Sequence, residues 1–265
     1  MPLLVAIFVF AFGAIVGSFL NVVIHRYPRE ESIVFPPSHC PRCDAKIKPY
    51  DNVPILSYLW LLGRCRACRE WISPRYPLIE LANGLFYLAV FQRTGLQAGF
   101  IPVAAIVSMT IVLIFIDLEI QILPDVIDLP GIAIGLAIGA LGLGASTDLL
   151  LAKSWIESVA GAVAGGGLLL AVALAYRLVR KRDGMGLGDV KMLAMIGAVT
   201  GWQAVLGVLF GASVVGAVFG TALALRHEQG FRVAIPFGVF LGLSLLTTIF
   251  FGGELYEWYL SLLLA

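Results

Sequence analysis

Long stretches without a single charged residue constrain this chain more than any other feature. They cover residues 1–24, 94–116, 129–147, 158–176, 192–225 and 233–253. About 20 apolar residues in a helix cross the hydrocarbon core of a membrane, so each stretch is long enough for a span. The stretches are continuously apolar, which argues against a β-barrel, whose strands alternate between apolar and polar residues.

The composition indicates the same class of protein. Hydrophobic residues make up 60% of the chain and charged residues only 13%, whereas a soluble domain carries about 25% charged residues. So few charges cannot cover a soluble core, and the surface must face lipid. This excludes a soluble enzyme, a disordered chain and a disulfide-stapled secreted domain. The net charge of +1 indicates no polyanionic partner such as a nucleic acid.

One stretch is too long for a single span. Residues 192–225 would form one helix of about 51 Å, so we expect a break at Gly201-Trp202-Gln203. A further span over 76–92 is uncharged except for Glu80. The sequence therefore predicts an all-α polytopic membrane protein with about eight transmembrane helices.

Lys and Arg are distributed unequally between the two sides of the membrane. If residue 1 lies outside, the inside segments are 26–75, 117–125, 177–191 and 226–232. They hold all the basic residues except Arg93 and Lys153. Cytoplasmic loops are enriched in Lys and Arg, so the N-terminus is predicted to lie outside.

The same topology divides the chain into three parts. A first transmembrane helix (1–25) precedes a cytosolic tetracysteine domain (26–75), and a second membrane domain follows (76–265). Cys40 and Cys43 form one Cys-x-x-Cys motif of the middle part, and Cys65 and Cys68 form the other.

Two such motifs at this separation suit a four-thiolate zinc site, in which each motif supplies two ligands. Disulfides are rare in the cytosol, which favours a metal over two bridges. Four thiolates leave no open coordination position, so we expect a structural Zn²⁺ that folds a small zinc-ribbon-like domain. Mixed charges in the segment argue against nucleic-acid binding.

Two aspartates stand at the ends of predicted spans. Asp117 follows the third span, and Asp189 precedes the sixth in the sequence Gly186-Leu187-Gly188-Asp189. The predicted topology places the inner end of the one span and the inner start of the other at the same depth. We therefore expect the two carboxyl groups to meet at the cytosolic edge of the membrane.

Two carboxyl groups at one site can divide the acid and base roles, because both cannot easily ionise. The charged group would take a proton from a water that attacks a peptide carbonyl, and the neutral group would donate one. Gly184, Gly186 and Gly188 would let the backbone approach an extended substrate. The alternative is that Asp117 and Asp189 only cap or anchor helix ends.

Several short motifs follow one another along the chain. They are Gly17-Ser18-Phe19-Leu20-Asn21, the two cysteine motifs, Asn52-Val53-Pro54, Arg75-Tyr76-Pro77 with Glu80, Ile116-Asp117, Leu123-Pro124-Asp125, Gly186-Leu187-Gly188-Asp189 and Ile235-Pro236-Phe237-Gly238. Taken together and in this order, they resemble the type IV prepilin peptidase family. The resemblance implies a GxGD-type aspartic peptidase of the bacterial inner membrane with its active site at the cytosolic face. It also implies that Asp117 and Asp189 are the catalytic pair.

In such a peptidase the substrates are type IV prepilins and type II secretion pseudopilins, which lose a short basic leader. The resemblance further implies methylation of the new N-terminus with S-adenosylmethionine. No glycine-rich cofactor motif indicates where the methyl donor binds, and family analogy places it near the cysteine loop, where Gly63 and Arg64 precede the second motif. A peptidase without methylation would keep the same spans and aspartates.

Two other classes stay open. A proton-coupled carrier would use Asp117, Glu80 and Asp189 as a relay, but both aspartates are expected at one face of the membrane, and no inverted repeat is visible. A zinc-bearing assembly factor would explain the cysteines and leave the aspartates unused. The sequence also leaves open the oligomeric state and the roles of Glu80, Asp125 and Lys191.

Other polar residues have plainer interpretations. His25 and Arg26 are interpreted as interfacial anchors at the inner end of the first span. Asp128 is interpreted as a group at the membrane interface or in solvent.

Overall fold

The computed structural model describes residues 3–182, 185–226 and 235–264. Gly184, one of the glycines expected beside the substrate, and residues 227–232 of the last predicted inside segment lie outside these ranges. Over the described ranges the chain is helical, and its only strand-like pairings are two isolated β-bridges, His39 with Lys46 and Arg64 with Trp71. This confirms the all-α class.

Eight long helices are found in the described ranges. They are α1 (Leu3–Arg26), α3 (Arg75–Thr94), α4 (Phe100–Ile120), α5 (Asp125–Ala140), α6 (Trp155–Arg180), α7 (Leu187–Thr200), α8 (Trp202–Arg226) and α9 (Phe237–Leu264). Of these, α1, α4, α6, α8 and α9 are long and apolar enough to cross a membrane. The count of eight membrane spans stays a prediction.

The chain divides into two compact units, residues 1–95 and 96–265. In unit 1, α1 and α3 pack with their backbones in close contact. A Cβ atom on Gly17 would lie 2.8 Å from the Cα of Glu80, and one on Gly13 would lie 2.8 Å from the Cβ of Tyr87. Small residues four apart allow helices to approach in this way. Asn83 donates to the carbonyl of Gly13 at 2.7 Å and fixes the register of the pair.

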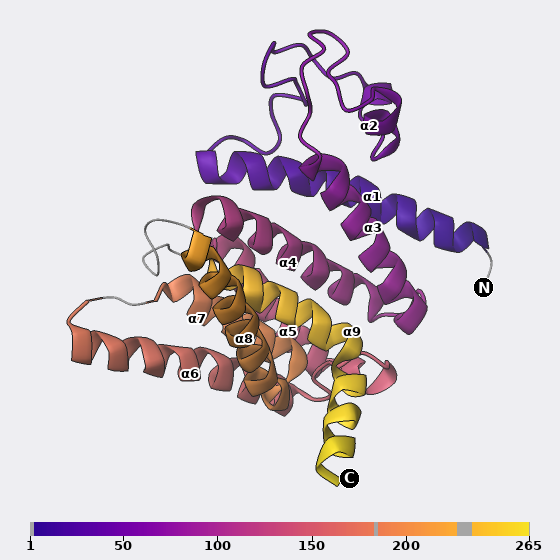
Figure 1. Cartoon of the computed structure of the whole chain (residues 1–265). Helices are drawn as coiled ribbons and strands as arrows, with labels where there is room; N and C mark the ends of the chain where they lie inside the picture. Colours follow the sequence, from indigo (N-terminus) through magenta and orange to yellow (C-terminus); the bar gives the residue numbers. More distant parts are fainter. Residues whose placement is uncertain (1–2, 183–184, 227–234, 265) are drawn as a thin grey trace. The chain divides into compact units, whose positions relative to one another are not determined.

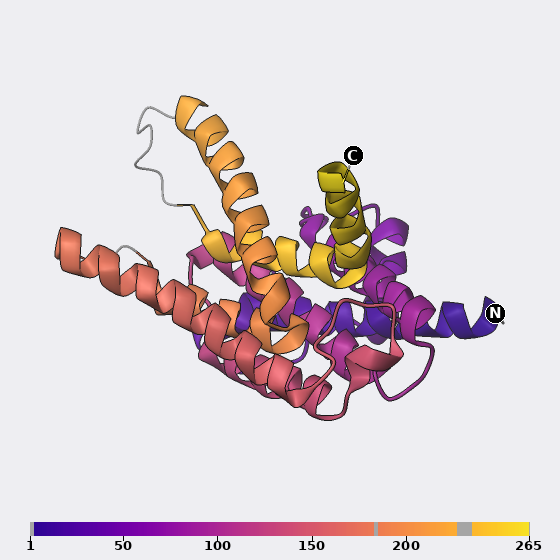
Figure 2. The same cartoon turned by 90° about the horizontal axis from the view of Figure 1, so that it is seen from below.

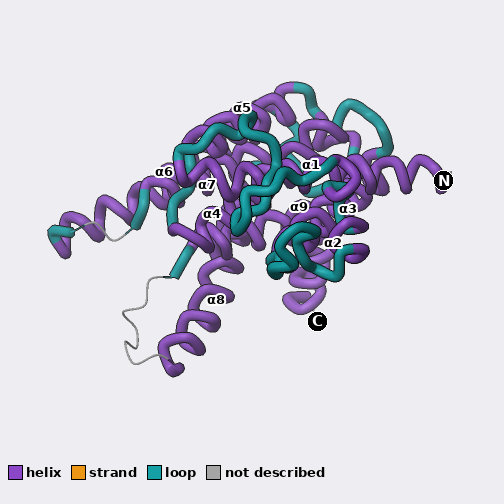
Figure 3. The backbone as a smooth tube through the Cα atoms, turned by 90° about the horizontal axis from the view of Figure 1, so that it is seen from above, coloured by secondary structure: helices purple, strands orange, loops and turns teal. Residues whose placement is uncertain are grey.

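The segment between α1 and α3 is mostly loop (Figure 3). Its regular elements are the short helix α2 (Leu56–Trp60) and the 3-10 turns η1 (Tyr27–Arg29) and η2 (Pro49–Asp51). Arg26 is buried and donates to the carbonyls of Ser32 at 3.0 Å and Pro36 at 2.8 Å. The interpretation of Arg26 as an interfacial anchor is therefore wrong, because its guanidinium holds the start of this loop.

The core of unit 2 lies around α7, which packs against α5, α6, α8 and α9 (Figure 1). Met192, Leu193, Met195 and Ile196 of α7 have no exposed surface. The ends of α6, α8 and α9 extend past the packed part of unit 2 (Figure 2). Leu178, near the end of α6, is accordingly 81% exposed.

The predicted break inside 192–225 is confirmed. Helix α7 ends at Thr200, Gly201 follows with φ of +83°, and α8 starts at Trp202. A glycine adopts this left-handed backbone without strain, so the chain turns there at little cost.

The charge-free stretches misplace the bounds of several helices. Helix α4 continues to Ile120, so that Asp117 lies inside its last turns. Helix α5 covers Asp125–Ala140 rather than 129–147, because acidic residues are favoured in the first turn of a helix. Residues 143–146 form instead the 3-10 turn η3 (Leu143–Ser146).

Candidate active site and metal centre

Asp117 lies near the end of α4 and is only 4% exposed. Its Oδ2 accepts a hydrogen bond of 3.0 Å from the backbone N–H of Val239, in the first turn of α9. The contact joins residues 122 positions apart in the sequence. The carboxyl group of Asp117 is thus held between two helices of unit 2.

Asp189 is the third residue of α7 and is half-buried. The negative charge of Asp117 acts on it, so the two carboxyl groups lie near each other. Leu123 fills the space between the helix ends: a Cβ on Gly188 would lie 2.8 Å from its Cβ, and one on Gly238 would lie 2.9 Å from its Cδ1. The end of α4 and the starts of α7 and α9 therefore meet around one leucine.

Two further aspartates lie on the first turns of α5. Asp125 is exposed and forms an ion pair with Lys191, whose Nζ lies 2.6 and 2.7 Å from the two carboxylate oxygens of Asp125. Asp128 has no exposed surface, and neither of its carboxyl oxygens has a hydrogen-bond partner. The interpretation of Asp128 as an interfacial or solvated group is therefore wrong. An acidic residue in the first turn of a helix can lie on the buried side of the helix, as Asp128 does, or on the exposed side, as Asp125 does.

The four cysteines of unit 1 come together. The Sγ atoms of Cys40, Cys43, Cys65 and Cys68 all lie within 4.8 Å of one another, and those of Cys40 and Cys68 are 3.9 Å apart. Four thiolates around Zn²⁺ at about 2.3 Å are separated by about 3.8 Å. The donor set therefore fits a tetrahedral zinc ion.

The two cysteine motifs have the same backbone geometry. In the first, the backbone N–H of Cys40 donates to the carbonyl of Ala45 at 3.0 Å. In the second, the backbone N–H of Cys65 donates to the backbone carbonyl of Glu70 at 2.9 Å. The residue after each motif, Asp44 or Arg69, has a positive φ. Two matching turns present two pairs of sulfurs to one point, as a metal centre requires.

The second motif also favours the thiolate form that binds metal. A backbone hydrogen bond from Cys68 lowers the pKa of Cys65 to about 7. Residues beside this motif are structural: a Cβ on Gly63 would lie 2.9 Å from the hydroxyl of Tyr58, and the guanidinium of Arg64 lies 4.7 Å from the ring centre of Trp71.

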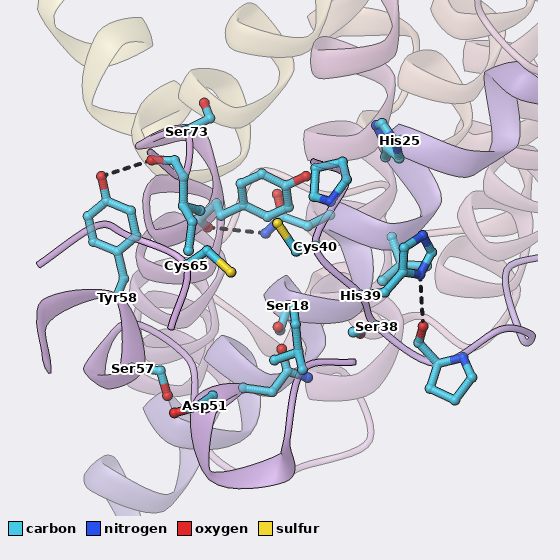
Figure 4. A pocket seen from close by; sticks show the side chains of 18 of the residues that line it. Ser18, His25, Ser38, His39, Cys40, Asp51, Ser57, Tyr58, Cys65 and Ser73 are labelled. Atoms are coloured by element: carbon cyan, nitrogen blue, oxygen red, sulfur yellow. Dashed lines mark hydrogen bonds between the residues drawn. The ribbon is translucent and has the colours of Figure 1, made fainter. Parts of the chain in front are cut away.

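A pocket of about 1010 Å³ opens in unit 1, between the cysteine cluster, the C-terminal end of α1 and the N-terminal end of α3. Figure 4 shows Cys40 and Cys65 with Ser18 and His25 around it. Glu80 lines the pocket and accepts a hydrogen bond of 2.7 Å from the backbone N–H of Ile55. Its carboxylate therefore ties the loop to α3.

The sequence alone indicates no role for the first turn of α9. Its Gly238 and Val239 contact Asp117 through the main chain. The segment Ile235-Pro236-Phe237-Gly238 was the available signal, because a glycine directly after the start of an apolar helix indicates a close approach.

These features define a helical membrane protein with a pair of aspartates at its helix ends and a separate four-cysteine metal centre. Two protein families match the chain: the Bacterial Peptidase A24 N-terminal domain over residues 11–94 and the Type IV leader peptidase family over residues 104–221. The boundary between the two matches falls near the boundary between the two units.

Curated relatives cover nearly all of the chain. The prepilin leader peptidase/N-methyltransferase of Aeromonas salmonicida is 36% identical over 293 residues, which cover 100% of this chain and 97% of the relative. The protein of that name from Myxococcus xanthus is 42% identical, over 84% of this chain and 64% of its own length. The one from Pseudomonas putida is 34% identical, over 95% of this chain and 92% of its own length. No solved structure matches. The chain belongs to the type IV leader peptidase family.

Proposed function

We propose that this protein is a membrane aspartic peptidase that removes the leader from type IV prepilins and pseudopilins, with Asp117 and Asp189 as its catalytic pair. The observation that carries this proposal is that the end of α4, which holds Asp117, and the start of α7, which holds Asp189, meet around Leu123 in one unit. Relatives named prepilin leader peptidase/N-methyltransferase support the choice of substrate.

The pair would act by general acid–base catalysis. One carboxylate takes a proton from a water molecule that attacks the carbonyl carbon of the scissile peptide. The other carboxyl group donates its proton to the carbonyl oxygen and later to the leaving nitrogen. Asp189 is less buried than Asp117, so the side of α7 offers the approach for water and substrate.

The protein would also methylate the new N-terminal amine. When bound, S-adenosylmethionine supplies the methyl group. The pocket of unit 1 has the volume for such a ligand and combines polar and aromatic lining, including Asn21, Tyr76 and Glu80. Zn²⁺ on the four cysteines would hold the loop that forms one wall of this pocket.

The orientation follows from the basic residues. We place the N-terminus outside, the tetracysteine segment 26–75 in the cytosol and the aspartate pair at the cytosolic face of the inner membrane. The basic leader of the substrate would then stay in the cytosol, while the apolar segment after the cut lies beside the spans in the lipid.

The proposal is tested by incubating the detergent-solubilised protein with a prepilin and S-adenosylmethionine and weighing the product. Asp117→Asn and Asp189→Asn should each reduce cleavage by at least about 1,000-fold, because each removes an acid or base of the reaction. Asp148→Asn, at an exposed position in the loop before α6, is the matched control and should cleave normally.

The outcomes separate the alternatives. A product that has lost its leader and gained the mass of one methyl group supports both activities, and a product without the added mass supports a peptidase alone. Normal cleavage by either Asn variant would contradict the catalytic pair. A folded wild-type protein that never cleaves would contradict the peptidase and favour the carrier or the assembly factor.

A further inference from the structure

The motif Ile235-Pro236-Phe237-Gly238 has no role in the proposed chemistry so far. It leads into α9, which starts at Phe237, so Gly238 and Val239 occupy the second and third positions of that helix. Backbone N–H groups in the first turn of a helix have no partner within the helix. The N–H of Val239 donates instead to Oδ2 of Asp117, at 3.0 Å.

Gly238 makes this contact sterically feasible. A Cβ atom at this position would lie 2.9 Å from Oδ2 of Asp117, and 2.9 and 3.0 Å from the two methyl carbons of Leu123. Contacts this short do not occur for real side chains, so any other residue would push Asp117 or Leu123 away. Gly253, on the same helix, has nothing within 4 Å of the point that a Cβ atom would occupy, and it makes no such demand.

The start of a helix also carries a partial positive charge of about half an elementary charge. A carboxylate that accepts a helix N–H group is stabilised in its charged form. Asp189 also lies in a first turn, that of α7, and the repulsion between the two carboxylates acts on both, so the hydrogen bond from Val239 is what distinguishes Asp117. Of the pair, Asp117 is thus the better placed to be the charged member.

We propose that the first turn of α9 is a positioning element of the peptidase site: Val239 N–H holds Asp117 and stabilises its charged form, and Gly238 allows the approach. Asp117 is then the general base, and Asp189 is the general acid. This inference rests on the proposed function.

The charged groups on the helix of Asp117 and on the helix ends around it have to be considered as well, and of these Asp189 interacts with Asp117 directly. They are Glu119 on its own helix, Asp125 and Asp128 on α5, and Asp189 and Lys191 on α7. Lys191 is paired with Asp125. The first turn of α9 carries no acidic residue. The substitutions below leave all these groups in place.

Val239→Pro removes the N–H donor alone. Proline is tolerated in the first turn of a helix, and Gly238 before it has no Cβ to clash with the ring. Val239→Ala is the matched control, since it shortens the side chain and keeps the N–H. The measurement is kcat/KM for prepilin cleavage against pH, on folded full-length protein in detergent.

For Val239→Pro we expect the acidic limb of the profile to move to higher pH by about one unit. The reason is that the charged carboxylate of Asp117 loses the hydrogen bond that it accepts from the N–H of residue 239. The alkaline limb and the whole profile of Val239→Ala should stay in place. Movement of the alkaline limb alone would assign the acid role to Asp117 and overturn the inference. So would a Val239→Pro profile identical to that of Val239→Ala.

Gly238→Ala provides a second test if Val239→Pro does not fold. It should lower kcat by about 10- to 100-fold with little change in KM, since it displaces a catalytic carboxyl group by a fraction of an ångström to an ångström. Gly253→Ala, the control on the same helix, should leave both constants unchanged. Equal kcat values for the two alanine variants would overturn the inference. If wild type cleaves and Asp117→Asn does not, these failures concern only the role of α9 and leave the proposed function intact.

Discussion

The two units hold their geometry by different means. In the loop segment 27–74 of unit 1, only Cys40 and Gly63 are buried. In unit 2, α7 alone contributes nine buried residues among its 14. The loop of unit 1 therefore depends on a few specific bonds, namely the cysteine cluster and hydrogen bonds from side chains to the main chain. Unit 2 depends on the close packing of helices.

This difference follows from what each region must do. A loop with almost no apolar core cannot fold on burial alone, so a metal and clamps such as that of Glu80 on Ile55 have to fix it. A pair of aspartates from distant helices needs rigid surroundings, and densely packed helices supply them. Perturbations should accordingly damage one unit and spare the other.

The largest effect is expected from removal of the metal. Zinc bound by four thiolates contributes about 10 kcal/mol or more of apparent folding free energy in small domains. A chelator, or Cys40→Ser, should therefore expose the amides of the two cysteine motifs to hydrogen exchange, while those of α7 stay protected. The measurement is hydrogen exchange by mass spectrometry at pH 7.

Addition of Zn²⁺ should restore protection in the chelator-treated wild type and not in the Cys40→Ser variant. Equal exchange of the motifs with and without the chelator would contradict a structural metal centre. Loss of protection in α7 as well would contradict the independence of the two units.

The cysteine cluster could be predicted because its determinants are local. Each Cys-x-x-Cys motif forms its own turn through local hydrogen bonds, and the metal centre requires only that the two turns come together. The buried position of Arg26 could not be predicted, since it depends on carbonyl groups that the loop presents only after folding. A basic residue at the end of a span has the same sequence signature whether it lies in solvent or under a loop.

The second effect concerns the helix packing of unit 2. A Cβ atom on Gly161 of α6 would lie 2.0 Å from the carbonyl oxygen of Gly197 on α7. Gly161→Ala must therefore separate the two backbones, and we expect a loss of about 1–3 kcal/mol in the free energy of unfolding. Gly167→Ala, on the same helix with nothing within 4 Å, should be neutral or stabilising by up to about 1 kcal/mol.

Thermal unfolding in detergent, followed by circular dichroism, measures this difference. The metal centre should remain intact in both variants, which a thiol-accessibility assay can show. A Gly161→Ala variant as stable as Gly167→Ala would mean that α6 and α7 can separate freely, contrary to the packing argument.

The helices of unit 2 could largely be predicted, because a lack of charge over about 20 residues is a strong signal. The errors occurred where charged residues belong to helices: Asp117 lies within α4, and Asp125 and Asp128 start α5. The hydrogen bond of Val239 to Asp117 could not be predicted, since it joins main-chain and side-chain atoms of helices far apart in sequence. Periodicity and composition contain no information on such a contact.

The smallest effects are expected from one partly exposed ion pair in each unit. In unit 1, Arg66 donates to both carboxylate oxygens of Asp51, at 2.8 and 2.5 Å, and holds the pKa of Asp51 below its usual range. In unit 2, Lys191 pairs with Asp125. Exposed pairs contribute little, and salt screens them.

We expect Lys191→Met to lower the free energy of unfolding of unit 2 by less than about 1 kcal/mol, because the packed core of this unit is unaffected.

Arg66→Met should increase hydrogen exchange around η2 and the second cysteine motif, since few other bonds hold that loop. The contribution of the Arg66 pair requires a charged Asp51: it is fully present above about pH 4, the ordinary pKa of an aspartate, and is lost as the pH falls through the lowered pKa of the folded state. The effect of Arg66→Met should therefore be the same at pH 7 and pH 6, where zinc stays bound, and should fade in high salt. A larger effect of Lys191→Met on unit 2 than of Arg66→Met on the loop would contradict the comparison between a bond-dependent and a packing-dependent unit.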